Sequence, residues 1–194
     1  MSHRRTNTMN TVEAIKDINQ INMIKDYLKT RSARDYCLFL FGINTGIRIN
    51  ELIHLHVKDV MDETGNIRPF LLSSIYESPS VYLNNPVRKA IENCITAEGL
   101  QYDDFLFRSR KTATSISRQQ AYRIINEAAK YAEIEGSIGT HTLRKTFGYH
   151  AYLKGIAISL IQKRLQQSTP SETIQYIGLA KERHTLPIIL DVNL

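Results

Sequence analysis

The chain has 194 residues, enough for one globular domain with a substantial core. Hydrophobic residues make up 42% of it and charged residues 23%, an ordinary composition that excludes a disordered, collagen-like or membrane-embedded chain. No apolar run approaches the roughly 20 residues of a membrane span. The N-terminus also lacks the apolar stretch of a signal peptide, so we expect a cytoplasmic protein with no membrane partner.

Positive charge is concentrated in one part of the chain. The 25 Lys and Arg residues against 19 Asp and Glu give a formal net charge of +6. Residues 108–154 hold nine basic and three acidic groups, so this stretch carries an excess equal to that of the whole chain. Such a run is compatible with a solvated basic face and with a surface for a polyanion such as nucleic acid.

Helix signals dominate the N-terminal part of the chain after a loose segment, 1–12, that we predict to be flexible. Asp17, three residues before Gln20, has capping-box spacing ahead of INMIKDYL, and Ser32 has the same relation to Asp35 ahead of DYCLFLFGI. The second of these helices is apolar enough to be central. A turn at Asn44-Thr45-Gly46 should separate it from a further helical stretch, IRINELIHL.

Residues 57–84 have a different character. Thr64-Gly65-Asn66 is typical of a turn, and IRPFLLSSIY and SVYLN carry the β-branched and aromatic residues that strands prefer. These segments predict a small antiparallel sheet, to which DDFLF could add a strand. Asn85 followed by Pro86 then predicts the N-cap and first position of a helix through VRKAIENCI.

The C-terminal half is predicted to be helical. Ser117 and Gln120 form a capping box, and the helix they open has a regular apolar stripe: Ala121, Ile124, Ile125, Ala128, Ala129 and Ala132. THTLRKTFGYHAYL and AISLIQKRL read as two more helices, separated near Gly155. Thr169-Pro170-Ser171-Glu172 then starts a helix that carries Tyr176. The fold class is therefore α+β and mostly helical, with a small antiparallel sheet on one side of a single domain, 13–194.

Metal and hydrolase motifs are missing from the sequence. His54 and His56 are two positions apart and point to different sides of a helix, and no Cys-x-x-Cys, His-Glu-x-x-His, Gly-x-Ser-x-Gly or phosphate-loop pattern occurs. Cys37 and Cys94 lie in apolar helix-like segments and are expected to be reduced core thiols. We therefore expect no dedicated metal site.

Three polar clusters in helical surroundings carry the candidate chemistry. Arg48 and Glu51 are three residues apart, so the carboxylate could hold the guanidinium in place. His141 and Arg144 have the same spacing, and Tyr176 is a candidate nucleophile. Two arginines and a histidine suit a phosphodiester, because guanidinium groups bind its non-bridging oxygens and imidazole moves protons.

Each cluster also has a structural interpretation. Arg48 with Glu51 could be an ordinary surface ion pair, and His141 a capping or buried, hydrogen-bonded histidine. Arg144 with Lys145 could simply form a basic helix face. Tyr176 is one of ten tyrosines. No cluster decides the function alone.

Taken in order, the clusters resemble the catalytic domain of the tyrosine recombinase (phage integrase) family. TGIRINEL is similar to that family's Thr-Gly-x-Arg-x-x-Glu-Leu box, and IGTHTLRKTFGYH to its His-x-Leu-Arg-(Lys/His)-Thr-Phe box. LIQKRLQQSTPSETIQYIG resembles its Leu-Gly-His box with the following Thr-x-x-Tyr, and LFRSRKTATSISRQQAYRIINEAAKYAEI also reads like the family. The resemblance covers about residues 17 to 180.

The resemblance implies a site-specific DNA recombinase or integrase that uses neither metal nor cofactor. Arg48 and Arg144 would hold the scissile phosphate, and His141 would assist as acid and base. Tyr176 would attack phosphorus and form a 3′-phosphotyrosyl intermediate with a free 5′-hydroxyl. Gln167 stands where the family has a second histidine or tryptophan, and its amide can still donate to a phosphate oxygen. Glu51 would support Arg48.

One departure from the family concerns the leaving group. The family has a catalytic lysine in the hairpin between its second and third strands, and the corresponding SSIYESPS has none. Ser74 or Glu77 would lie near that position, and Lys58 or Lys111 could act as the acid from elsewhere. General-acid assistance is typically worth about 10²–10⁴-fold, so cleavage could be weakened. The alternative to an enzyme is therefore a recombinase-like DNA-binding or regulatory protein.

A second departure is architectural. Family members commonly carry an N-terminal core-binding domain, for which this chain has no room, so we expect a minimal recombinase like the single-domain fimbrial inversion enzymes or a catalytic fragment. The expected partner is double-stranded DNA, with a tetramer on DNA and accessory DNA-bending proteins implied by the resemblance. The basic residues expected to contact DNA are Arg108, Arg110, Lys111, Arg118, Arg123 and Lys145.

Overall fold

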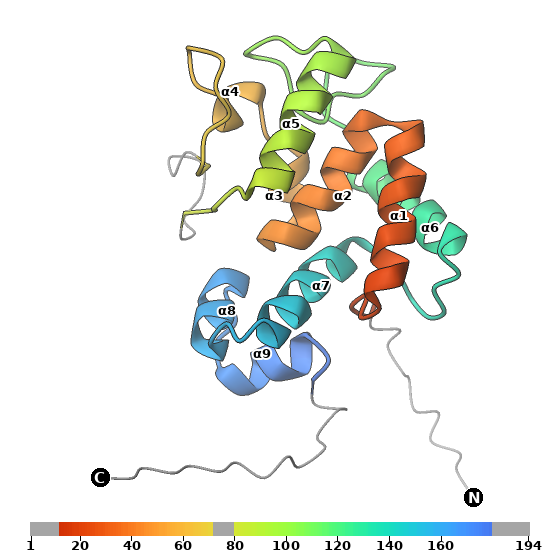
Figure 1. Ribbon diagram of the computed structural model, residues 1–194, viewed down its shortest axis with the longest axis vertical. Helices are drawn as coiled ribbons and strands as arrows, with labels where there is room; N and C mark the ends of the chain where they lie inside the picture. The colour runs from red at the N-terminus through yellow and green to blue at the C-terminus, as the bar shows by residue number, and fades with distance from the viewer. Residues whose placement is uncertain (1–11, 72–79, 180–194) are drawn as a thin grey trace, which may run out of the picture.

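The protein is mostly helical, as predicted (Figure 1). The computed structural model describes residues 12–71 and 80–179, so most of the segment 1–12, predicted to be flexible, lies outside the described residues. The helices in these ranges are α1 (Ile18–Arg31), α2 (Ala33–Thr45), α3 (Ile49–Ile53), α4 (Val57–Val60), α5 (Asn85–Glu98), α6 (Arg118–Tyr131), α7 (Thr140–Leu153), α8 (Ile158–Leu165) and α9 (Pro170–Tyr176). None of them combines the length and apolar composition needed to cross a bilayer.

Four helices begin where their capping residues predict. The side-chain oxygens of Asp17 and Ser32 accept backbone N–H groups at the starts of α1 and α2, at 2.8 and 3.2 Å. Ser117 and Thr169 do the same for α6 and α9, each at 3.1 Å. An N-cap of this kind stabilises a helix by about 1 kcal/mol because it satisfies a donor that has no partner within the helix. These four N-cap positions are confirmed, but the full predicted capping box forms only at Ser117, where Gln120 Oε1 accepts the Ser117 N–H at 2.7 Å.

Two helix boundaries differ from the prediction. The N-cap of α5 is Asn84 and not Asn85, because the side chain that reaches the Val87 N–H, at 3.1 Å, is that of Asn84. The stretch IRINELIHL is a helix only over α3, which begins after Arg48 and ends at Ile53. The glycine turn before it and the bend after it leave room for little more than one turn.

The small antiparallel sheet is not confirmed. Within the described residues there is no strand, only isolated antiparallel bridges, among them Met61 with Ile67 and Phe70 with Tyr82. Phe105, from the segment that was to add a strand, pairs in the same way with His56. The segment 72–79, where the two predicted strands would meet, lies outside the described residues.

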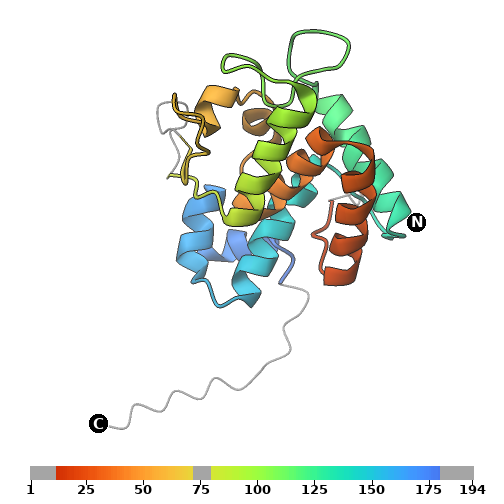
Figure 2. The same ribbon diagram turned by 45° about the horizontal axis from the view of Figure 1, so that its top comes forward.

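The main core surrounds α2, which packs against α1, α5 and α7. Figure 2 shows α2 between α1 and α5. Its sequence leaves six consecutive residues buried: Cys37, Leu38, Phe39, Leu40, Phe41 and Gly42. The predicted stripe of α6 is largely buried as well, at Ala121, Ile125, Ala128, Ala129 and Ala132. Because α2 is apolar on nearly all sides, it must lie inside the molecule, as its sequence predicts.

A second, smaller hydrophobic cluster joins α7, α8 and α9, which lie at one end of the molecule (Figure 1). We call it the satellite cluster. Its buried members are Ile161, Leu165 and Ile177, with Phe147, Ala151, Ile158, Tyr176 and Leu179 packed around them. The helix that carries Tyr176 is therefore held by this cluster and not by the main core.

Two glycines allow the segments around this cluster to approach closely. Gly46 ends α2 in the left-handed region, at φ 65°, and a β-carbon there would collide with the Phe147 ring. Gly148, in α7, faces Ile177 and Leu165, and its β-carbon would lie 2.5 Å from Ile177 Cγ2. Both positions bring α7 against segments that carry predicted site residues.

Candidate functional site

Arg144 joins three segments that are distant in sequence. Its side chain is buried in α7, and its guanidinium donates to the carbonyl oxygen of Gly46 at 2.9 Å and to that of Leu165. The first carbonyl belongs to the turn before Arg48, and the second to the end of α8. Burial lowers the pKa of this guanidinium, as does the charge of Arg48. An arginine nevertheless keeps its proton, so the structure buries a fixed positive charge between these segments.

Arg48 and Glu51 form the predicted ion pair. The Arg48 Nη1 lies 3.2 Å from Glu51 Oε1, and the second carboxylate oxygen accepts the Arg48 backbone N–H at 3.3 Å. The Arg48 side chain remains 48% exposed, so the pair lies at the surface with guanidinium donors to spare. The charges of both residues act on the pKa of Arg144, which places the pair beside the buried arginine.

Tyr176 ends α9 with its side chain half-buried. Its phenol interacts with Arg144 through a hydrogen bond and through its charge when ionised, and both raise the pKa of the guanidinium. The Lys145 ammonium lies over the ring, 5.0 Å from its centroid. The residue predicted as nucleophile is therefore in contact with the arginine predicted to hold the phosphate.

His141 is an exposed residue in the first turn of α7. Desolvation lowers its pKa most, and the positive charges of Arg118, Arg144 and Lys145 lower it further. The imidazole is therefore neutral at neutral pH and can accept a proton. It lines a hollow with Val12, Arg118 and Tyr122, so α6 contributes to the same surface.

Gln167 follows α8 with a buried amide oxygen that has no hydrogen-bond partner in the described part of the chain. Its backbone is fixed, because its N–H donates to Gln162 O and its carbonyl oxygen accepts from Gln162 Nε2. Leaving a buried polar atom without a partner costs about 1–3 kcal/mol.

The residues expected to contact DNA fall into two groups. Arg108 and Arg110, in the connection between α5 and α6, pair with Asp104 and Glu98 at 2.8 and 2.9 Å, and line a hollow with Lys111. This connection lies at the end of the molecule opposite α8 and α9 (Figure 1). The second group lies on α6 and α7. The charge of Arg118 lowers the pKa of His141, the Lys145 ammonium lies over the Tyr176 ring, and Arg123 is exposed on α6.

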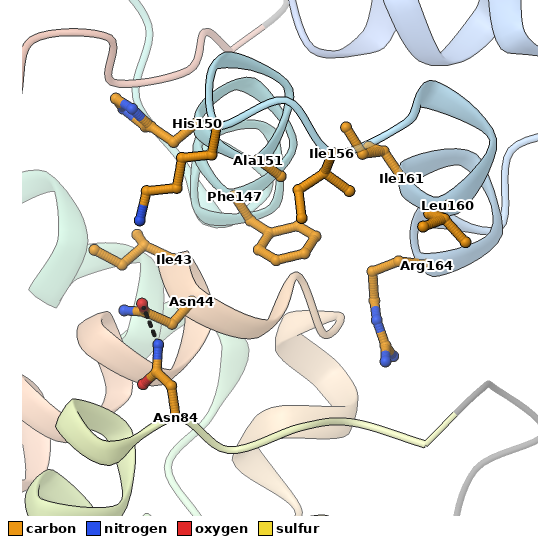
Figure 3. Close-up of a pocket in the computed structure, with 11 residues that line it drawn as sticks. Ile43, Asn44, Asn84, Phe147, His150, Ala151, Ile156, Leu160, Ile161 and Arg164 are labelled. Carbon is orange, nitrogen blue, oxygen red and sulfur yellow. Dashed lines mark hydrogen bonds between the residues drawn. The ribbon is translucent and has the colours of Figure 1, made fainter.

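Arg164 is a basic residue near the site that the sequence analysis missed. It donates to the Ser80 carbonyl oxygen at 2.6 Å, and burial and the charge of Arg144 lower its pKa, while Glu51 raises it. Figure 3 shows it at the rim of a largely apolar hollow, pointing toward the chain that leads to Asn84. That hollow contains none of the predicted site residues. Its place in the sequence could have pointed to it, because Arg164 lies inside the segment LIQKRLQQSTPSETIQYIG that resembles the family's third box.

The comparisons with known proteins agree on one family. The phage integrase family matches residues 14–183. The "Probable integrase/recombinase YoeC" of Bacillus subtilis (strain 168) is 37% identical over 174 residues, which cover 90% of this chain and 93% of that protein. The "Type 1 fimbriae regulatory protein FimE" of Escherichia coli (strain K12) is 34% identical over 148 residues, 74% of each chain.

Solved structures show the same fold. The crystal structure of XerA recombinase has a TM-score of 0.69 at 21% identity, over 91% of this chain and 61% of that one. The pre-cleavage complex of XerH recombinase with its difH substrate has a TM-score of 0.66 at 19% identity, over 86% of this chain and 50% of that one. Both solved chains are therefore considerably longer than the region they share with this chain.

Proposed function

Because the chain belongs to the phage integrase family, we propose that it is a site-specific recombinase that cleaves and rejoins double-stranded DNA through a 3′-phosphotyrosyl intermediate. The observation that carries the proposal is the cluster around Arg144. Tyr176, Arg48 and Glu51 all act on the pKa of its guanidinium, Tyr176 through a hydrogen bond as well as through charge. These residues come from three separate boxes of the sequence.

Arg48 and Arg144 are proposed to bind the non-bridging oxygens of the scissile phosphate. Arg48 has donors directed to solvent, and Arg144 is held rigidly by two backbone carbonyls. Their two positive charges offset the charge that develops on the phosphorus oxygens during attack. Gln167 is proposed to contact the same phosphate by donating from its amide N–H2 group, and Glu51 to hold Arg48.

Tyr176 is proposed as the nucleophile and His141 as the acid and base. The phenol oxygen forms the new bond to phosphorus, its proton passes to the neutral imidazole, and the bond from phosphorus to the 5′-oxygen breaks. The reverse step, with another 5′-hydroxyl, rejoins the strands. The lowered pKa of His141 supports this role, since a neutral imidazole is the form that accepts a proton.

The leaving 5′-oxygen needs a proton, and the described residues offer no free lysine at the place where the family has one. The segment SSIYESPS has no lysine, and its Ser74 and Glu77 lie outside the described residues. Lys58 is engaged with Asp103 at 2.8 Å, and that carboxylate raises its pKa, which makes it a poorer acid. We therefore propose that activity is reduced. A non-catalytic DNA-binding or regulatory protein is the second candidate.

The remaining assignments follow from the family. We propose that residues 13–194 act as one catalytic domain and that the protein assembles as a tetramer on DNA, with accessory DNA-bending proteins where the site requires them. The proposed DNA surface comprises Arg118, which acts on His141, Arg123 on the same helix, and Arg108, Arg110 and Lys111 further away.

A suicide DNA substrate tests the proposal. A nick beside the scissile phosphate lets the released fragment diffuse away, so that a covalent protein–DNA adduct accumulates. We expect an adduct with the unaltered protein and none with Tyr176→Phe, while both bind the DNA equally. Binding without any adduct would favour the non-catalytic candidate, and no specific binding would overturn the proposal.

A further inference from the structure

Lys145 was expected to contact DNA, but its ammonium lies over the ring of Tyr176. We propose that Lys145 is a positioning residue for the nucleophile: it holds the phenol ring in place and stabilises the negative charge that develops on it during attack. This inference rests on the proposed function, because it concerns the same site.

Neighbouring residues of α7 engage two different parts of the tyrosine. Arg144, buried within the domain, interacts with the phenol oxygen, and Lys145 covers the ring face at 5.0 Å from the centroid. The ring also packs against the satellite cluster, directly before the buried Ile177. A ring held at its oxygen, at its face and by apolar packing has little freedom to turn, and a fixed nucleophile reacts faster than a mobile one.

The surroundings of Lys145 shelter this contact. Lys145 and Tyr176 line a hollow whose other walls are formed by the N-terminal segment and the end of α9: Val12, Glu13, Ala14, Lys16, Gln175 and Gly178. Lys16 donates to the Gly178 carbonyl oxygen at 3.4 Å, which ties the two walls together. A cation over an aromatic ring gains more when it is shielded from water than at an open surface.

A cation at this place would favour the proposed attack. When the phenol oxygen attacks phosphorus it loses its proton, and part of the resulting charge is delocalised over the ring. The face of the ring attracts a cation, and this attraction grows as the ring becomes more negative. Lys145 therefore stabilises the attacking state more than the resting state, which is the condition for accelerating a reaction.

The experiment compares Lys145→Met, Lys145→Arg and the unaltered protein on a nicked suicide substrate at saturating DNA. Lys130→Met is the matched control, since Lys130 is an exposed lysine in the last turn of α6. We expect Lys145→Met to slow adduct formation by about 3- to 30-fold, and Lys145→Arg to restore most of the rate, because both cations bind aromatic faces. The dissociation constant for DNA and its salt dependence should change little in any variant.

Three outcomes would overturn the inference. An unchanged rate at saturating DNA with weaker, less salt-dependent binding would make Lys145 a phosphate contact, as first expected. Lys145→Met could be slow on ordinary DNA but as fast as the unaltered protein on a 5′-bridging phosphorothiolate. This result would make Lys145 the acid for the leaving group, because that substrate needs no such acid. No effect on rate or binding would leave Lys145 without a role. If the unaltered protein forms no adduct, the proposed function fails, a separate result.

Discussion

Gly148 of α7 lies against Ile177, the residue that directly follows Tyr176. A β-carbon at Gly148 would lie 2.5 Å from Ile177 Cγ2 and 3.0 Å from Leu165 Cδ1. The position of the proposed nucleophile on α9 thus depends on Gly148 of α7 having no side chain.

Gly148→Ala should therefore displace α9 and slow adduct formation. Overpacking of this kind costs about 1–3 kcal/mol of stability, measurable by urea unfolding. Gly42→Ala is a matched control, since its β-carbon would lie 2.5 Å from the tip of Leu143, away from α9. Both variants should lose stability, but only Gly148→Ala should be slow when compared as folded protein. Equal rates for the two would show that the close approach has no part in positioning Tyr176.

Arg48 and Arg144 should differ in their effect on stability. Arg48→Ala removes a partly exposed ion pair and should change the free energy of unfolding by no more than about 1 kcal/mol. Arg144→Ala leaves the carbonyls of Gly46 and Leu165 without their donor and should cost about 1–3 kcal/mol or more. Both variants should lose adduct formation. A stable Arg144→Ala protein would contradict the bridging role of this side chain.

The salt dependence of DNA binding should distinguish Arg118, beside His141, from Arg110, in the connection between α5 and α6. Each phosphate contact adds about 0.9 to the slope of log affinity against log salt. Arg118→Ala should lower the slope by about that amount, and Arg110→Ala by less, because Arg110 is paired with Glu98. Fluorescence anisotropy with labelled DNA at several salt concentrations measures both. The reverse order would place the DNA over the connection between α5 and α6.

His141 should make stability depend on pH. Its folded-state pKa is lowered, so the unfolded chain binds a proton more readily. Its contribution is therefore fully present above its ordinary value of about 6.5 and is lost as the pH falls through the lower folded value. His141→Gln should remove this dependence, so that unfolding midpoints of the two proteins converge or cross between neutral and acidic pH. A constant difference across this range would contradict the prediction.

A substrate with a better leaving group should rescue the slow chemistry. A 5′-bridging phosphorothiolate leaves as a thiolate that needs little protonation, so it bypasses a missing acid but not a missing nucleophile. The unaltered protein should form adduct faster on this substrate than on ordinary DNA, and Tyr176→Phe should form none on either. Equal rates on both substrates would indicate that another residue supplies the proton or that a different step limits the rate.

Local signals predicted much of the helical fold correctly. Capping by Asp17, Ser32, Ser117 and Thr169 depends on groups within three residues, which a sequence displays directly. The N-cap of α5 was placed one residue too late because two asparagines precede the proline and either could cap. The sheet was predicted from residue preference alone, and strand formation also requires a partner that such preference does not specify.

The site could be predicted only in part. The ion pair of Arg48 with Glu51 has helical spacing and was expected. Pairing of Arg110 with Glu98 was not, because the two belong to different segments that the fold brings together. The same holds for Arg164, which reaches Ser80 across the molecule, and for Lys145, whose side chain turns toward α9. Long-range contacts of this kind carry no local pattern.

The satellite cluster gives α8 and α9 a stability of their own. Ile161, Leu165 and Ile177 bury little surface compared with the core around α2, so α8 and α9 can open at a lower free-energy cost than the whole domain. Amide hydrogens in α9 should therefore exchange faster than those of α2, even in fully folded protein. Opening would release both the Tyr176 ring and the Leu165 carbonyl that accepts from Arg144, so the proposed nucleophile is fixed only while the cluster is closed.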